Sequence, residues 1–212
     1  MRRLPVYLLI DTSGSMHGEP IEAVKSGIQM LVSSLRQDPY ALETAFLSVI
    51  TFASEARQVM PLTELALFQA PEISASGATE MGAALTLLAK SIKNEVQKGT
   101  AEQKGDWRPI VFMLSDGSPT DDLDKGIRDM QSVKVGTFVA CAAGSGADSS
   151  VLKRITEIVV NLDTADATSI KSFFKWVSSS ISVSSQKIEL GKKEVAGLED
   201  FPPPPPEVNV VI

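Results

Sequence analysis

The sequence has very few of the residues that form disulfides or bind transition metals. Its 212 residues include one cysteine, Cys141, and one histidine, His17. A single cysteine cannot form an intramolecular disulfide, and zinc, which prefers cysteine and histidine ligands, finds only one of each. The scarcity of cysteine fits a reducing compartment, so we expect a cytoplasmic protein.

Long apolar runs and an excess of positive charge are also missing. No stretch approaches the roughly 18 apolar residues that a membrane-spanning helix needs, and the apolar stretch behind the basic start ends at Asp11, so we expect neither a membrane span nor an export signal. Twenty Lys and Arg against 26 Asp and Glu give a net charge of -6. This charge repels phosphate backbones and anionic lipids, which argues against nucleic acid or a membrane surface as a partner.

Short apolar runs alternate with amphipathic segments along most of the chain. This alternation predicts an α/β fold, a doubly wound and mostly parallel six-stranded Rossmann-like sheet flanked by helices. We expect the strand at 58–62 at an edge because it contains Pro61, and the very apolar strand at 110–114 in the centre. The other strands are expected at residues 6–10, 45–52, 137–141 and 158–160, and the helices at residues 21–35, 81–96, 123–130, 151–155 and 170–181.

The character of the sequence changes near residue 184. Charged residues then dominate, and five consecutive prolines occupy residues 202–206. We therefore expect a domain over residues 1–184 and a charged, proline-rich and flexible tail over residues 185–212. The prolines are equally compatible with a polyproline ligand and with a spacer.

Oxygen-bearing side chains gather where the predicted strands end. In a doubly wound sheet the ligand site lies beyond the carboxyl ends of the strands, where the winding reverses. The first strand ends in Asp11, Ser13 and Ser15, the central strand ends in Asp116, and the loop before the helix at 81–96 supplies Thr79. Hydroxyl and carboxylate oxygens suit Mg²⁺ or Mn²⁺, whereas Ca²⁺ is less favoured because its larger shell needs more oxygens.

These five residues resemble the metal-ion-dependent adhesion site of the von Willebrand factor A domain family. That site has the pattern Asp-x-Ser-x-Ser, a distant Thr and a distant Asp, which Asp11, Ser13, Ser15, Thr79 and Asp116 match in full. The resemblance implies that the serines bind the cation directly, that the aspartates act mostly through water, and that the threonine does either. It also implies a non-catalytic, metal-dependent protein-binding module, because an open position on the cation attracts a Glu or Asp of a partner.

Two segments, residues 3–16 and 114–121, are also similar to the TerY-like branch of this family, which accompanies bacterial tellurium-resistance clusters. This resemblance implies a cytoplasmic scaffold in a stress response. The partners it implies are other tellurium-resistance proteins, or an associated kinase and phosphatase.

Other interpretations of the same residues stay open at this stage. Asp11 is also compatible with a cap at the strand end, and Ser13 and Ser15 with turn formers. A further alternative is an interaction module in which the cation is purely structural. The enzymatic alternative is a Mg²⁺-dependent phosphohydrolase, because such enzymes also carry an aspartate at the end of a strand. Their pattern resembles Asp-x-Asp, whereas this chain has Ser13 at the position of the second aspartate. His17 is expected on the surface, and Asp121, Asp122 and Asp124 are expected in the first turn of the next helix rather than around the metal.

Overall fold

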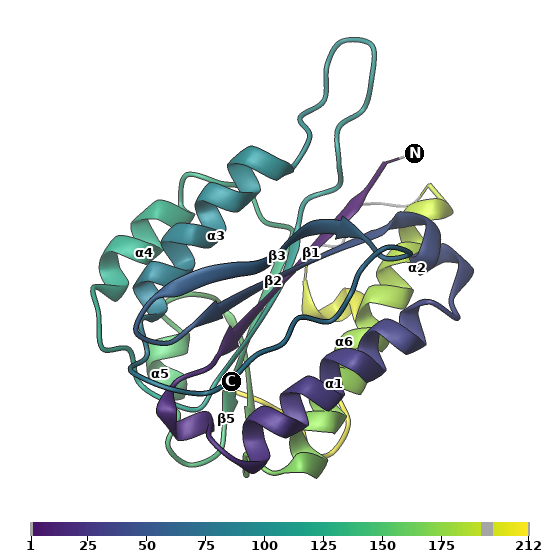
Figure 1. Cartoon of the computed structure of the whole chain (residues 1–212). Helices are drawn as coiled ribbons and strands as arrows, with labels where there is room; N and C mark the ends of the chain where they lie inside the picture. The colour runs from purple at the N-terminus through teal and green to yellow at the C-terminus, as the bar shows by residue number, and fades with distance from the viewer. Residues whose placement is uncertain (1, 192–196, 212) are drawn as a thin grey trace.

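The computed structural model describes residues 2–191 and 197–211 and contains one mixed sheet of seven strands. The strand order is β3-β2-β1-β4-β5-β6-β7 (Figure 1). The strands are β1 (Leu4–Asp11), β2 (Ala45–Phe52), β3 (Ala56–Glu64), β4 (Ile110–Ser115), β5 (Thr137–Ala143), β6 (Ile158–Leu162) and β7 (Asn209–Val210). All neighbours pair in parallel except β3 and β7, which pair antiparallel at the two edges.

The central strands are apolar because both faces of the sheet are covered. Every residue of β1 is buried, and its side chains alternate between two cores. Val6, Leu8 and Ile10 belong to one core, whereas Tyr7 and Leu9 belong to the other. Such continuous apolar runs are typical of parallel strands between two helical layers.

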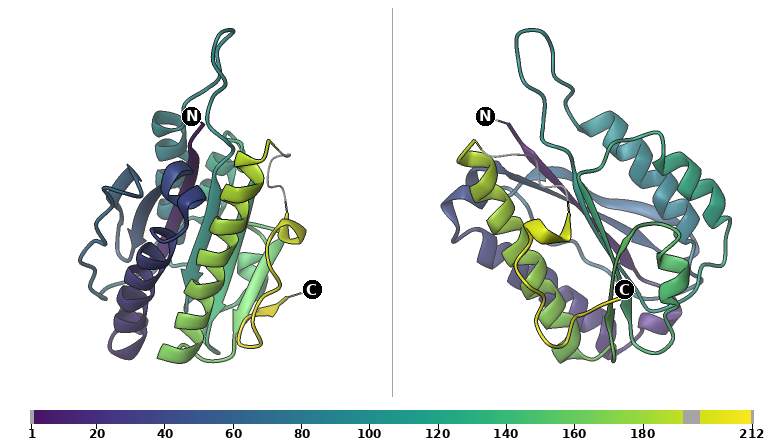
Figure 2. Two further views of the ribbon diagram at one scale, coloured as in Figure 1. Left: turned by 90° about the vertical axis from the view of Figure 1, so that its right-hand side faces the viewer. Right: turned by 180° about the vertical axis from the view of Figure 1, so that it is seen from behind.

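Helices form a layer on each face of the sheet (Figure 2). The first layer contains α1 (Glu19–Leu35), α2 (Pro39–Thr44) and α6 (Ala167–Glu189), whose buried residues join the first core. The second layer contains α3 (Met81–Glu95), α4 (Leu123–Met130) and α5 (Ser149–Leu152). Short 3-10 helices lie at Gly14–Met16 (η1) and Leu198–Asp200 (η2). No helix in the described ranges has the length and apolar character needed to cross a membrane.

The predicted α/β fold is confirmed, with the strand at 110–114 in the centre and the strand that contains Pro61 at an edge. The prediction of six strands was wrong by one, because β7 adds a seventh strand beside β6. The short apolar run at residues 208–212 was assigned to the tail. The strand has only two residues, both exposed, and it forms by pairing with the open edge of the sheet. Helix α2 was likewise not predicted, since its six residues are too few for a periodic stripe.

The described part of the tail lies against the first helical layer. Helix α6 continues to Glu189, and Phe201 is buried between Phe112 and Trp176. The indole nitrogen of Trp176 donates to the carbonyl of Pro202 at 2.8 Å. The division at residue 184 and the flexibility of the tail stay predictions, and residues 192–196 and 212 of that tail lie outside the described residues.

Candidate metal centre

The candidate site lies where the carboxyl ends of β1 and β4 meet, at the point where the strand order reverses. Asp11 ends β1, and Asp116 follows Ser115, the last residue of β4. Ile10 pairs with Leu114, so the next residues of the two strands, Asp11 and Ser115, lie side by side. The Ser115 hydroxyl donates to Asp11 Oδ2 at 2.5 Å.

The loop after β1 brings two serine hydroxyls to the same point. The Ser13 main-chain N–H donates to Asp11 Oδ1 at 2.8 Å, which turns the chain back over the strand end. Ser13 Oγ and Ser15 Oγ are 3.0 Å apart, and the Ser15 hydroxyl donates to Asp116 Oδ1 at 2.7 Å. One connected set of hydrogen bonds therefore joins the first and central strand ends.

Thr79 reaches the site from the loop that precedes α3. Gly77, with φ +82°, accepts a hydrogen bond from the Gly14 N–H at 2.9 Å and so ties this loop to the serine turn. A Cβ placed on Gly117 would lie 3.4 Å from Thr79 Oγ1 and 4.0 Å from Ser15 Oγ. The threonine and serine hydroxyls thus flank the same glycine, and the structure brings together all five residues that the sequence singled out.

The electrostatics of the site fit a bound cation. Asp11 is fully buried, and among the described residues no ion pair involves Asp11 or Asp116. Burial raises the pKa of the Asp11 carboxyl, hydrogen bonds from Ser115 and Ser13 oppose that rise, and the nearby Asp116 adds to it. A buried carboxylate without a positive neighbour is costly, and a divalent ion beside these hydroxyls would offset the cost.

The donor set also limits the kind of metal. No group of three or more His, Cys, Asp and Glu side chains within residues 2–191 and 197–211 is arranged to hold a metal ion. The site therefore depends on serine and threonine hydroxyls as much as on carboxylates. Oxygen-only donors of this kind suit a divalent cation.

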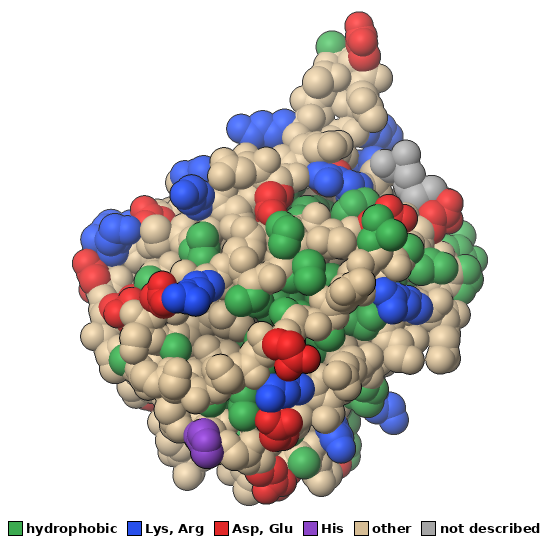
Figure 3. Space-filling model, in the orientation of Figure 1, with side chains coloured by type: hydrophobic (Ala, Val, Ile, Leu, Met, Phe, Trp, Pro, Cys, Tyr) green, Lys and Arg blue, Asp and Glu red, His purple; other side chains and the backbone are tan. Residues whose placement is uncertain are grey.

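The three aspartates of the β4–α4 region other than Asp116 serve helices. The Asp122 carboxylate caps α4, and Asp124 lies in the first turn of α4 and forms an ion pair with Arg154, so the helical interpretation holds for both. Asp121 instead caps the neighbouring helix α3, accepting from its main-chain N–H groups at 2.9 and 2.7 Å. The single histidine, His17, is exposed as expected (Figure 3).

The sequence interpretation missed the residues that support the site. Ser115 holds Asp11, the Thr120 hydroxyl accepts the Thr79 N–H at 3.2 Å, and Ser54 Oγ accepts the Ala78 N–H at 3.0 Å. Ser115 could have been found from the sequence, because it is a polar residue directly after the apolar run at 110–114. The ends of adjacent parallel strands lie at the same edge of the sheet, which places it near Asp11. The other two act through loops whose contacts no periodic pattern predicts.

Comparisons with known proteins bear on the family of this chain. The family model described as von Willebrand factor type A domain matches residues 6–190. Comparison with curated proteins gave no match.

Several solved structures share the fold at low sequence identity. Proximal thread matrix protein 1 from the mussel byssus, solved with a zinc-occupied metal-ion-dependent adhesion site, is 18% identical with a TM-score of 0.61 over 84% of this chain and 48% of its own. A von Willebrand factor type A protein from Catenulispora acidiphila is 18% identical with a TM-score of 0.65, over 85% and 43%. The pilus adhesin SpaC from Lactobacillus rhamnosus GG is 13% identical with a TM-score of 0.66, over 86% and 31%. The chain thus spans less than half the length of each.

Proposed function

The chain belongs to the von Willebrand factor type A domain family, and we propose that it is a non-catalytic protein-binding module that recognises an acidic side chain of a partner through a divalent cation. The observation that carries this proposal is the convergence of three hydroxyls and two carboxylates from three separate loops. The proposed metal site consists of Asp11, Ser13, Ser15, Thr79 and Asp116.

Each residue has a defined part in the proposed site. Ser13 and Ser15 would hold the ion directly, Thr79 directly or through water, and Asp11 and Asp116 mostly through water. Both Asp11 oxygens already accept hydrogen bonds, from the Ser13 N–H and the Ser115 hydroxyl. This suits a carboxylate that would contact the ion through a water molecule rather than directly. Neutral hydroxyls would cancel little of the ion's charge, so an ion held here would attract a carboxylate of a partner.

The main alternative, a Mg²⁺-dependent phosphohydrolase, fits this arrangement poorly. Such an enzyme needs an aspartate oxygen free to attack phosphorus. Asp11 is 0% exposed, and its two carboxylate oxygens are held at 2.8 and 2.5 Å. Residue 13, where a second carboxylate would assist, is a serine. These contacts favour binding over catalysis.

The proposed setting is a cytoplasmic scaffold of a tellurium-resistance or stress response, partnered by other tellurium-resistance proteins or by an associated kinase and phosphatase. Its support is the similarity of residues 3–16 and 114–121 to the TerY-like branch. Affinity purification from the native cell, with Mg²⁺ in one arm and EDTA in the other, would identify the partner. Recovery of the same proteins in both arms would contradict a metal bridge.

The metal site itself is tested by calorimetric titration of the metal-free chain. We expect uptake of Mg²⁺ or Mn²⁺, weakened about tenfold or more by Ser13→Ala or Ser15→Ala, because each removes a direct ligand, and weakened less by Asp116→Asn. Ser33→Ala, an exposed serine on α1, is the matched control and should bind normally. Full metal affinity in all three site variants would contradict the assignment.

A purely structural cation predicts a different pattern. Asp11→Ala would then lower the melting temperature and leave partner binding intact at a temperature where the chain is folded. On the proposed function, Ser13→Ala abolishes partner binding while the chain stays folded, and chelation does the same. Comparing binding with melting for the two variants therefore separates the two interpretations.

A further inference from the structure

A second cleft lies at the opposite end of the sheet from the candidate metal centre. It has a volume of about 630 Å³ and is bounded by the chain before β1, the end of α3, the two ends of the loop between α3 and β4, and the loop before β5. Strand β1 rises about 3.3 Å per residue, so its ends, Leu4 and Asp11, are about 23 Å apart. A ligand in this cleft would leave the metal site free.

The cleft is cationic although the protein as a whole is acidic. Its lining contains Arg2, Lys93, Lys98, Arg108 and Lys134. Figure 3 shows Lys and Arg side chains around the base of the protruding loop between α3 and β4, which forms one wall. A local excess of cations on a protein of net charge -6 creates a positive region that attracts anionic ligands.

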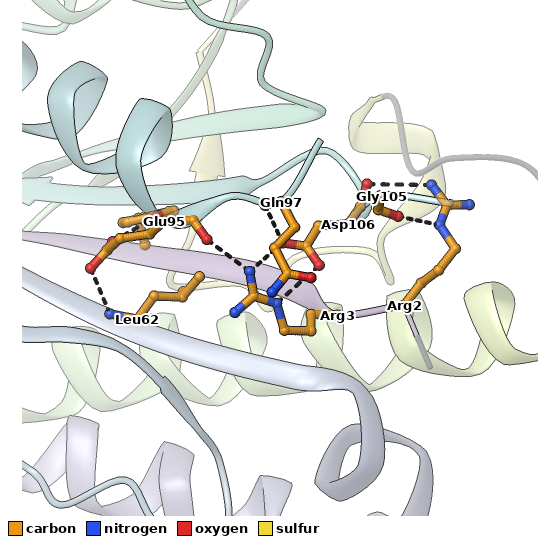
Figure 4. A network of polar contacts seen from close by, with 8 residues as sticks. Arg2, Arg3, Leu62, Glu95, Gln97, Gly105 and Asp106 are labelled. Atoms are coloured by element: carbon orange, nitrogen blue, oxygen red, sulfur yellow. Dashed lines mark hydrogen bonds and ion pairs between the residues drawn. The ribbon is translucent and has the colours of Figure 1, made fainter. Parts of the chain in front are cut away.

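The one carboxylate in the lining is already neutralised. Asp106 accepts from Arg3 Nε at 2.9 Å and from an Arg3 terminal nitrogen at 2.5 Å, and the Gln97 N–H donates to it at 2.7 Å (Figure 4). Its side chain is only 3% exposed. Arg3 is outside the lining, so its ion pair with Asp106 means that this carboxylate does not neutralise Arg2, Lys93, Lys98 or Lys134.

Arg2 is held in place by neutral groups. Its guanidinium donates to the carbonyls of Gly105 at 2.7 Å and Asp106 at 3.3 Å, and it stacks 3.6 Å above the ring of Trp107. These contacts fix the side chain without cancelling its charge. The Nε1 atom of Trp107 is buried and has no hydrogen-bond partner among the described residues. The cleft thus contains a cation whose position is fixed.

We infer that this cleft binds an acidic peptide segment of a partner protein, with carboxylates on the cations and apolar side chains on the floor. The floor is supplied by Ile92, Val96 and Val133. Lys93, Lys98 and Lys134 are exposed and come from different parts of the rim, so the charges are spread along the cleft. Spread charges match an extended chain of several carboxylates better than a single phosphate, for which donors converge on one point.

This inference goes beyond the proposed function and does not depend on it. A module with an acidic-peptide cleft at one end and a metal-bridged contact at the other holds two partners at once. That arrangement would make the chain a bridge between proteins, and each end can be inactivated separately.

Fluorescence anisotropy with the full chain tests the cleft. The probe is a short fluorescein-labelled peptide of Glu, Asp and Leu, and the control peptide replaces its acids by Gln and Asn. We expect the acidic peptide alone to bind, with an affinity that falls as salt rises. Lys93→Gln, Lys98→Gln and Lys134→Gln combined should weaken it about tenfold, because each exposed ion pair contributes a few-fold.

Two controls make the result specific. Lys25→Gln, Lys171→Gln and Lys175→Gln combined remove the same charge from α1 and α6, in the other helical layer, and should leave peptide affinity within about twofold of the original. Binding should also persist in EDTA and in Ser13→Ala. Absence of peptide binding, equal loss in the two triple variants, or loss on chelation would each overturn the inference; the last would place the peptide at the metal centre instead.

Discussion

Gly77 is the residue whose backbone conformation brings Thr79 toward the serine turn. Its φ of +82° is one that L side chains rarely adopt, and a Cβ there would lie 2.3 Å from Ser54 Oγ. That oxygen accepts the Ala78 N–H, so any movement of Ser54 costs a hydrogen bond. The position therefore requires glycine for both conformation and space.

Gly77→Ala should lower the free energy of unfolding by about 2–3 kcal/mol, combining left-handed strain with the lost hydrogen bond. Gly191→Ala is the matched control, since Gly191 also has a positive φ (+68°) but no atom within 4 Å of an added Cβ. It should cost only about 1 kcal/mol. Urea unfolding of both variants measures the difference, and equal costs would show that the contact with Ser54 is unimportant.

At this scale the oxygen donors were predictable and their supports were not. Asp11, Ser13 and Ser15 lie in one short motif. Asp116 comes just after the apolar run at 110–114, and Thr79 lies in the polar stretch before α3. Thr120, by contrast, supports Thr79 through a loop-to-loop contact 41 residues away. No local pattern encodes a contact of that kind, because loop geometry depends on how whole elements pack.

At the scale of elements, the start of α3 is held by a neighbouring loop. Glu80, at its N-cap position, makes no side-chain cap. Instead the Asp121 carboxylate, from the loop before α4, accepts from the main-chain N–H groups of Gly82 and Ala83. A carboxylate at a helix N-terminus satisfies free donors and interacts favourably with the helix dipole. This contact couples α3 to the β4–α4 loop that carries Asp116.

Asp121→Ala should therefore destabilise the fold by about 1–2 kcal/mol, as loss of an N-terminal cap does. Asp124→Ala, three residues later, removes an exposed ion pair with Arg154 and a charge in the first turn of α4, and it should cost less than about 1 kcal/mol. Chemical unfolding of the two variants side by side gives the comparison. A larger loss for Asp124→Ala would contradict the assigned roles.

Elements with a strong apolar signal were predicted from the sequence, and those formed by context were not. The runs that became β1, β2, β4, β5 and β6 are buried on both faces, so their composition alone identified them. Strand β3 extends beyond the predicted 58–62 because its pairing with β2 includes half-exposed residues. Strand β7, whose two residues are exposed, is defined by its antiparallel pairing with β6.

At the scale of the whole molecule, the two ends of the sheet carry opposite chemistry. The carboxyl ends of the strands gather carboxylates and hydroxyls, whereas the amino ends gather lysines and arginines around a cleft. Composition predicted the overall acidity but not this separation, because residues 2, 93 and 134 come together only when the sheet is assembled.

The tail offers the last prediction, because its sequence and its packing lead to opposite expectations. A flexible tail predicts that Phe201→Ala has little effect. The structure buries Phe201 to 7% exposure, with its ring 5.8 Å from Phe112 and 6.1 Å from Trp176. On this packing, Phe201→Ala should cost about 3 kcal/mol, whereas Val210→Ala, at 41% exposure, should cost less than about 0.5 kcal/mol. Thermal and urea unfolding of the two variants distinguish a tail that packs into the core from a flexible tail that adds no stability.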